Sequence, residues 1–300
     1  MKWIGRARPL YNGVMSACLD REEYIEQIYF FRVLRERMGD NLAAQEILER
    51  LHEEILSTTR LPFAIQFLAT EMKHSGLLSS GFARLPHYFT PFQSYIVQRT
   101  EVEGVRFSME TALLILEREA AYKAEGPTPT GLFVYQFEVL SRNKLGYDPG
   151  LAAIMADPLY DQTWRDYVEL VRRQGGTVDF ADLVYLRSDL YVEERRRDHA
   201  GYEPPVPALF GAKEGKIARA NRGRDPLYLF AALQRQLGYP VVPRPRPRDD
   251  LSAKLAVLQA RVKELETRLK LVEAEVKGQV DLGQFGKPEL LQGTSDDESA

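Results

Sequence analysis

The sequence has 300 residues, of which 44% are hydrophobic and 28% charged, a composition that is ordinary for a globular chain and excludes disorder throughout. The net charge of −3 gives no overall attraction to nucleic acid or to an anionic membrane, and no segment approaches the ~20 apolar residues that span a bilayer. The single cysteine, Cys18, excludes an intramolecular disulfide, and the N-terminal residues lack the apolar run of a signal peptide, so we expect a cytoplasmic protein.

Helix start signals recur through residues 20–238, after a short N-terminal arm (1–19). The motifs DREE (20–23) and TPFQ (90–93) have the spacing of a capping box. Asp-Pro pairs begin at Asp148, Asp157 and Asp225, and each places an acidic cap before a proline that suits the first helical position. Strand signals are few by comparison, and the sequence therefore predicts an all-α globular domain. The predicted helices are 21–38, 41–56, 62–75, 91–103, 109–125, 132–145, 159–174, 179–194 and 226–237.

The first predicted helix, 21–38, carries apolar residues on every side of its axis. Such a helix is normally central and buried, so we expect the other helices to surround it. Arg32 lies on this helix beside Ile28 and Tyr29, and Glu71 lies on the apolar face of the third predicted helix. Because two buried opposite charges offset each other's desolvation, we predict an Arg32–Glu71 ion pair.

Two Glu-x-x-His steps give Glu71 a different interpretation. Glu49 with His52, and Glu71 with His74, are each three residues apart and so share a helix face. The steps resemble those of di-iron helical bundles, which add two further glutamates, although in that family glutamate-only helices alternate with Glu-x-x-His helices and here the two steps lie on consecutive short helices. The resemblance implies a metal ion as cofactor and a metal-dependent enzyme, which we keep as an alternative; otherwise no cofactor is expected.

The segment LPHYFTPFQSY (85–95) is the densest aromatic cluster of the chain. It is explained by core packing, and the alternative is a groove for a ligand or peptide.

A basic strip covers residues 195–224, with five more Lys and Arg than Asp and Glu. Such a strip can neutralise phosphates, so binding of nucleic acid through 195–248 is a second alternative function, and the competing interpretation is a solvated face. Its basic residues are Arg195, Arg196, Arg197, Lys213, Lys216, Arg219, Arg222 and Arg224.

A linker rich in proline and arginine (239–250) separates the globular domain from a predicted coiled coil (251–277), which is followed by a small, acidic tail (278–300) expected to be disordered. Apolar residues recur in the coiled coil about every 3.5 residues. The a positions are Leu255, Val262, Leu269 and Val276, and the d positions are Leu251, Leu258, Leu265 and Val272. The alternative is an amphipathic helix that folds back on the globular domain.

Charges beside this apolar stripe favour a parallel pair of identical chains. In that arrangement Arg261 faces Glu266 of the other chain, and Arg268 faces Glu273, whereas an antiparallel pair sets arginine against arginine. Dimer and trimer both remain open. No nucleotide-binding loop or nucleophile motif occurs in the sequence, and we therefore expect a non-catalytic interaction or scaffold protein that self-associates and binds an unidentified protein partner.

Overall fold

The computed structural model describes residues 19–102, 104, 107–244 and 251–276. Within these residues the backbone forms fourteen helices and no β-sheet, which confirms the predicted all-α fold. The chain divides into two compact units, residues 1–245 and 246–300, and we call the first the body. The predicted N-terminal arm up to residue 18, the linker from 245 to 250 and the predicted tail lie outside the described residues.

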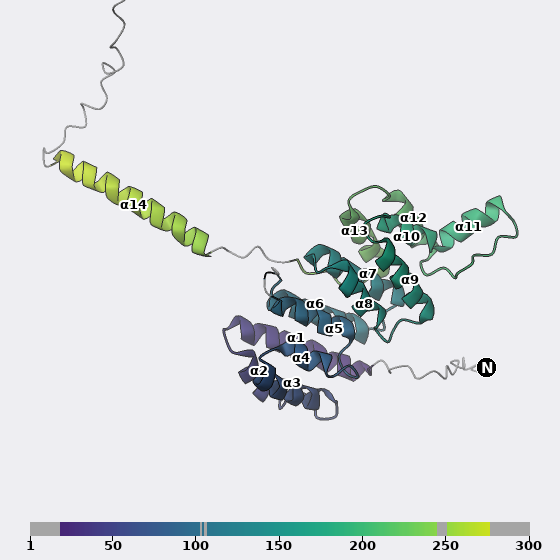
Figure 1. The fold of residues 1–300 in the computed structure, drawn as a ribbon, viewed down its shortest axis with the longest axis horizontal. Helices are drawn as coiled ribbons and strands as arrows, with labels where there is room; N and C mark the ends of the chain where they lie inside the picture. The colour runs from purple at the N-terminus through teal and green to yellow at the C-terminus, as the bar shows by residue number, and fades with distance from the viewer. Residues whose placement is uncertain (1–18, 103, 105–106, 245–250, 277–300) are drawn as a thin grey trace, which may run out of the picture. The chain divides into compact units, whose positions relative to one another are not determined.

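The first half of the body is organised around two helices that lie side by side, α1 (Arg21–Gly39) and α6 (Met109–Ala124) (Figure 1). Phe30, Phe31 and Leu34 of α1 are fully buried. Phe31 stacks on Phe82, which brings α4 into the same core. The remaining helices of this half are α2 (Ala44–Leu51), α3 (Leu61–Ser75), α4 (Leu78–Ala83) and α5 (Pro91–Glu101).

The second half of the body is built on α7 (Pro129–Asn143), whose residues from Gly131 to Leu140 are all buried. Phe133 of α7 packs on Trp164 and Tyr167 of α9, with ring centroids 5.6 and 5.5 Å apart. The other helices here are α8 (Tyr147–Met155), α9 (Gln162–Gln174), α10 (Phe180–Leu186), α11 (Asp189–Asp198), α12 (Ala212–Ala220) and α13 (Pro226–Leu237).

α1 has apolar residues on every side in sequence, but α7 is the helix that is buried on every side. Ile25 and Tyr29 of α1 are exposed, whereas Glu23, Glu26 and Gln27 are buried. The glutamates are buried because each binds a backbone amide: Glu26 accepts from Leu56 at 3.1 Å and Glu23 from the N–H of residue 60 at 2.9 Å. The prediction of a central, fully buried helix at 21–38 is wrong, and α7 has that position.

Several other predicted helices differ from the observed ones. The segment 41–56 is helical only at 44–51, and 179–194 is two helices, α10 and α11, separated at Arg187 and Ser188. α4 and α12 were not predicted, and α8 lies at the helix start predicted at Asp148 but outside the predicted helix ranges. α4 has no local cap; the carboxylate of Glu101 on α5 accepts from the N–H groups of Leu78 and Ser79 at 2.6 and 3.1 Å instead. A cap supplied from another helix leaves no sequence signal at the helix it starts.

Predicted helix caps are correct in part. Thr90 forms the predicted capping box with Gln93, and Asp225 caps α13. Asp20 precedes α1 but makes no side-chain cap, and the Glu23 carboxylate, which would complete the capping box, accepts from the Tyr88 hydroxyl instead. The Asp148 and Asp157 predictions are also wrong: α8 begins before Asp148, and α9 is capped by Asp161 while Asp157 is buried in the core.

The predicted linker starts later than residue 239. Tyr239 and Val242 are buried, and the Tyr239 hydroxyl donates to Glu138 at 2.6 Å. The side-chain amide of Asn143 donates to the carbonyl of Pro243 at 3.3 Å. Residues 239–243 are therefore packed as part of the body.

The second unit contains α14 (Leu251–Val276), which confirms a helix in the segment predicted as a coiled coil. The structure thus contains the predicted helix, and the pairing of this helix with a second copy remains a prediction.

Candidate functional site

The apolar stripe of α14 is exposed wherever its side chains are described. From Leu255 to Val276, the seven a and d residues have exposed fractions between 51% and 82%. Comparable side chains in the body are covered: Leu113 and Leu116 of α6 are 0% exposed. An apolar stripe of this length on one helix is a typical site of association with another helix.

Two further apolar residues of α14 lie outside the stripe. Val257 and Leu271 occupy the same heptad position, c, and are 67% and 45% exposed. Val257 and Leu271 are apolar residues on the same helix as the stripe, but they lie on a different face of it. They therefore provide an internal control for the role of the stripe. Among the charged residues, Arg268 pairs with Glu264 of its own helix at 2.7 Å, with both side chains largely exposed.

The basic strip is interrupted by acidic partners. Arg219 pairs with Glu194, and Arg222 pairs with Asp182 at 2.6 Å. Arg196 donates to the carbonyl of Tyr202 at 3.3 Å. Within the described part of the chain, Arg197, Lys213, Lys216 and Arg224 are exposed and form no ion pair. The strip is therefore a set of separate cations rather than one continuous positive surface.

Arginine and tyrosine side chains alternate around α11 in a way that the sequence analysis missed. Arg195 lies over the ring of Tyr191 at 5.3 Å, and Arg222 lies over Tyr185 at 4.1 Å. The residues of the first pair are four apart in the chain and those of the second are 37 apart. Only the first contact could therefore be predicted from sequence spacing. The first contact lies within α11, and the second joins α10 to the residues that follow α12.

The predicted Arg32–Glu71 ion pair is wrong. Arg32 donates through Nε to Oε1 of Glu117 at 2.8 Å, and its side chain is half exposed rather than buried. Glu71 is buried as predicted, but its carboxylate accepts from Arg84 at 2.5 Å and from the Ser80 hydroxyl at 2.9 Å. Both partners of Glu71 come from α4 and its C-terminal end, which the fold places beside this carboxylate.

The two Glu-x-x-His steps do not assemble into a metal site. Glu49 pairs with Lys73 at 2.8 Å, and Glu71 is held by Arg84. Among the residues that the structure describes, no group of three or more His, Cys, Asp or Glu side chains is placed to hold a metal ion. The carboxylates that were predicted to bind a metal together with His52 and His74 are therefore paired with Lys73 and Arg84 instead.

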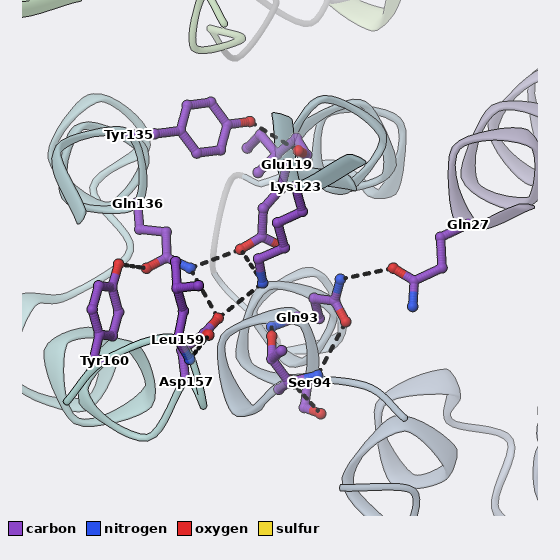
Figure 2. Close-up of polar contacts among 12 residues, drawn as sticks. Gln27, Gln93, Ser94, Glu119, Lys123, Tyr135, Gln136, Asp157, Leu159 and Tyr160 are labelled. Atoms are coloured by element: carbon purple, nitrogen blue, oxygen red, sulfur yellow. Dashed lines mark hydrogen bonds and ion pairs between the residues drawn. The ribbon is translucent and has the colours of Figure 1, made fainter. Parts of the chain in front are cut away.

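The most deeply buried charges lie elsewhere, between α6, α7 and the turn before α9 (Figure 2). Lys123 donates to Asp157 at 2.9 Å and lies 3.3 Å from Glu119, and all three side chains are almost completely buried. Gln136 donates to Glu119 at 2.7 Å and accepts from Tyr160 at 2.8 Å. The network links three segments of the body through charge-assisted hydrogen bonds.

Burial and pairing act in opposite directions on these groups. Burial raises the pKa of Glu119 above its usual value, and the neighbouring Lys123 opposes that shift. Burial alone lowers the pKa of Lys123, but the fields of Asp157 and Glu119 outweigh it and raise the pKa. The two carboxylates thus favour the charged form of Lys123, and removing one partner of this buried network would leave the remaining charge uncompensated.

The aromatic segment 85–95 contributes to both the core and a groove. Tyr88, Phe89 and Phe92 are buried, and Phe89 stacks on Phe82 with centroids 4.0 Å apart. A groove of about 560 Å³ is nevertheless formed by α4, α5 and α8, and the segment lines it through Pro86, Phe89 and Tyr95. The groove holds no charged residue, so its lining does not define what would fill it.

Within the described residues no helix is long and apolar enough to cross a membrane. The fold and its sites define an all-α protein with a helical body and an exposed, leucine-rich terminal helix. Comparison with models of protein families, with curated proteins and with solved structures finds no match to this chain.

Proposed function

We propose that the protein is a non-catalytic interaction or scaffold protein that self-associates through a parallel coiled coil of α14. The observation that carries this proposal is the exposure of the a and d stripe on a regular helix. Burying such side chains between two helices stabilises a pair by roughly 25 cal/mol for each Å² of apolar surface removed from water.

The partner that fits the stripe best is a second copy of α14. Arg261 and Arg268 precede Glu266 and Glu273 by five residues, which is the spacing that brings opposite charges together between parallel chains. Self-association would then hold two or three bodies together, each with its own partner-binding surface. The alternative of a metal-dependent enzyme loses its support, because its carboxylates are engaged with Lys73 and Arg84.

Light-scattering mass of the full chain tests the proposal. We expect two or three times the 34.3 kDa of one chain. Leu265→Glu should return the mass to that of one chain, because it places an unpaired carboxylate inside the helix interface. Leu271→Glu is the matched control on the same helix outside the stripe, and it should leave the mass unchanged.

Two results contradict the proposal. One is a wild-type chain that has the mass of a monomer at every concentration, which would mean that α14 serves a different protein or covers another surface of its own chain. The other is an equal loss of mass in Leu265→Glu and Leu271→Glu, which would show that the heptad stripe is not the contact.

Charge reversal tests the orientation. Changing Arg261 and Arg268 to Glu should weaken a parallel assembly, since each then faces a glutamate of the partner, and adding Glu266→Arg and Glu273→Arg should restore it. In an antiparallel pair, changing Arg261 and Arg268 to Glu replaces contacts between two arginines by contacts between two glutamates, so the repulsion stays about the same. Equal dissociation constants for wild type and the reversed variant would therefore contradict the parallel arrangement.

A further inference from the structure

A small pocket lies where α11 meets the loop 199–209, independent of the α14 stripe. Its volume is about 200 Å³, and its walls include Arg187, Tyr191, Tyr202, Pro204 and Val206. A neighbouring hollow of about 500 Å³ shares the two tyrosines and adds Arg195 and His199. Aromatic, proline and cationic side chains thus surround one site.

Backbone hydrogen bonds hold the wall of this pocket in place. The N–H groups of Leu209 and Phe210 both donate to the carbonyl of Arg187, at 2.8 and 3.1 Å. At the other end of the loop, the N–H of Tyr202 donates to the carbonyl of His199 at 2.9 Å. The pocket is therefore largely preformed, which lowers the ordering cost of binding a ligand.

Arg187 is the cation of this pocket that lacks a counter-charge. It forms no ion pair with any described residue, and its Nε and Nη2 are covered without a hydrogen-bond partner. Its guanidinium lies 5.5 Å from the ring centroid of Tyr167. Arg219 and Arg222 of the same region are both paired with carboxylates, whereas Arg187 is not.

The surroundings make the Arg187 charge costly. Desolvation lowers the pKa of its guanidinium, and the fields of Tyr167 and Asp166 oppose that effect only in part. A partly buried cation without an ion-pair partner gains from a bound oxyanion, because the anion supplies the opposite charge.

We propose that this pocket binds a small organic anion, in which a carboxylate or phosphate group pairs with Arg187 and a flat apolar body lies against Tyr202 and Pro204. The volume suits a single ring, and the adjoining hollow with Arg195 accommodates a larger substituent. Both oxyanions share the chemistry that a guanidinium recognises, and the two sources are separated by experiment.

Isothermal titration of the full chain with phenyl phosphate, benzoate and benzamide tests the proposal. We expect at least one anion to bind, and the neutral benzamide, which has the same shape as benzoate, to bind about tenfold more weakly or not at all, as for the loss of a hydrogen bond to a charged group. A preference for phenyl phosphate or benzoate identifies the group that the pocket selects.

Variants assign the binding to the pocket. Arg187→Gln should weaken binding of the anion about tenfold or more. Arg224→Gln, an exposed arginine of the basic strip that lines neither hollow, is the matched control and should not change it. Tyr202→Leu removes the ring from the partly exposed wall and should also weaken binding, which keeps the test valid if Arg187→Gln lowers stability.

Three results with these ligands and variants overturn the proposal, and a fourth comes from an oligonucleotide. The first three are equal affinity for benzoate and benzamide, an anion affinity that Arg187→Gln leaves unchanged, and equal losses in Arg187→Gln and Arg224→Gln. Binding of a single-stranded oligonucleotide without binding of phenyl phosphate also overturns it, in favour of an extended phosphate contact along the basic strip.

Discussion

Two helices of this protein have similar sequences in different surroundings. α6 and α14 are both rich in leucine, and both contain an acid and a base four residues apart. In α6, Leu113 and Leu116 are fully buried and the pair Glu119 and Lys123 is almost completely buried. In α14 the leucines from Leu255 to Leu271 are exposed, and the pair Glu264 and Arg268 is on the surface. The comparison shows that local pattern sets the helix, while tertiary packing sets what each contact contributes.

The largest expected difference concerns the two charged pairs. Lys123→Met leaves Glu119 and Asp157 buried without their cation, and it should lower the free energy of unfolding by about 3–5 kcal/mol. Arg268→Met removes an exposed pair and should change the unfolding of the body by less than about 0.5 kcal/mol. Urea unfolding of the two full-length variants measures both. Similar losses in the two would remove the distinction between the helices.

The leucines provide the next comparison. Leu113→Ala creates a cavity in the core and should lower the free energy of unfolding by about 2–5 kcal/mol. Leu269→Ala should leave the unfolding of the body unchanged and raise the dissociation constant of self-association. Thermal unfolding of the body and light scattering separate the two effects. Should Leu269→Ala destabilise the body as strongly as Leu113→Ala, α14 would be part of its core.

The smallest effect concerns acid stability. The hydrogen bond from Arg84, followed by that from Ser80, lowers the pKa of Glu71 below its usual value. A lowered folded-state pKa stabilises the protein above the pH at which the unfolded carboxyl titrates, and this stabilisation is lost as the pH falls through the folded-state pKa. Glu71→Gln should therefore lower the melting temperature at pH 7, and the difference from wild type should shrink as the solution is acidified.

The control for this measurement is Glu264→Gln, which removes the acid of the exposed pair in α14. Its melting temperature for the body should follow wild type at every pH. A difference between Glu71→Gln and wild type that stays constant down to acidic pH would show that Glu71 acts through packing rather than through its charge.

Local signals predicted the fold well. The capping box at Thr90 and the cap at Asp225 both depend on residues within one turn. Signals from distant residues were not available in the same way. Asp157 has the sequence context of a helix cap, yet its carboxylate binds Lys123, which lies 34 residues earlier.

The candidate sites follow the same division. The stripe of α14 could be predicted from the sequence because its spacing is periodic. The structure adds that its described residues are exposed. The sequence did not indicate the pocket at Arg187, because its walls come from the end of α10, the first part of α11 and a loop that is joined to Arg187 by backbone hydrogen bonds. Sequence spacing does not report which distant backbone groups approach a side chain.

By itself, the sequence determined the all-α class, the position of most helices and the heptad repeat of α14, since periodicity and capping act over a few residues. The tertiary structure decided which charges are paired: Arg32 with Glu117, Glu71 with Arg84 and Lys123 with Asp157. It also decided that α7, rather than α1, is the helix buried on every side. The physical reason is that a buried charge pairs with the group that packing brings within hydrogen-bond distance, and packing depends on the whole chain.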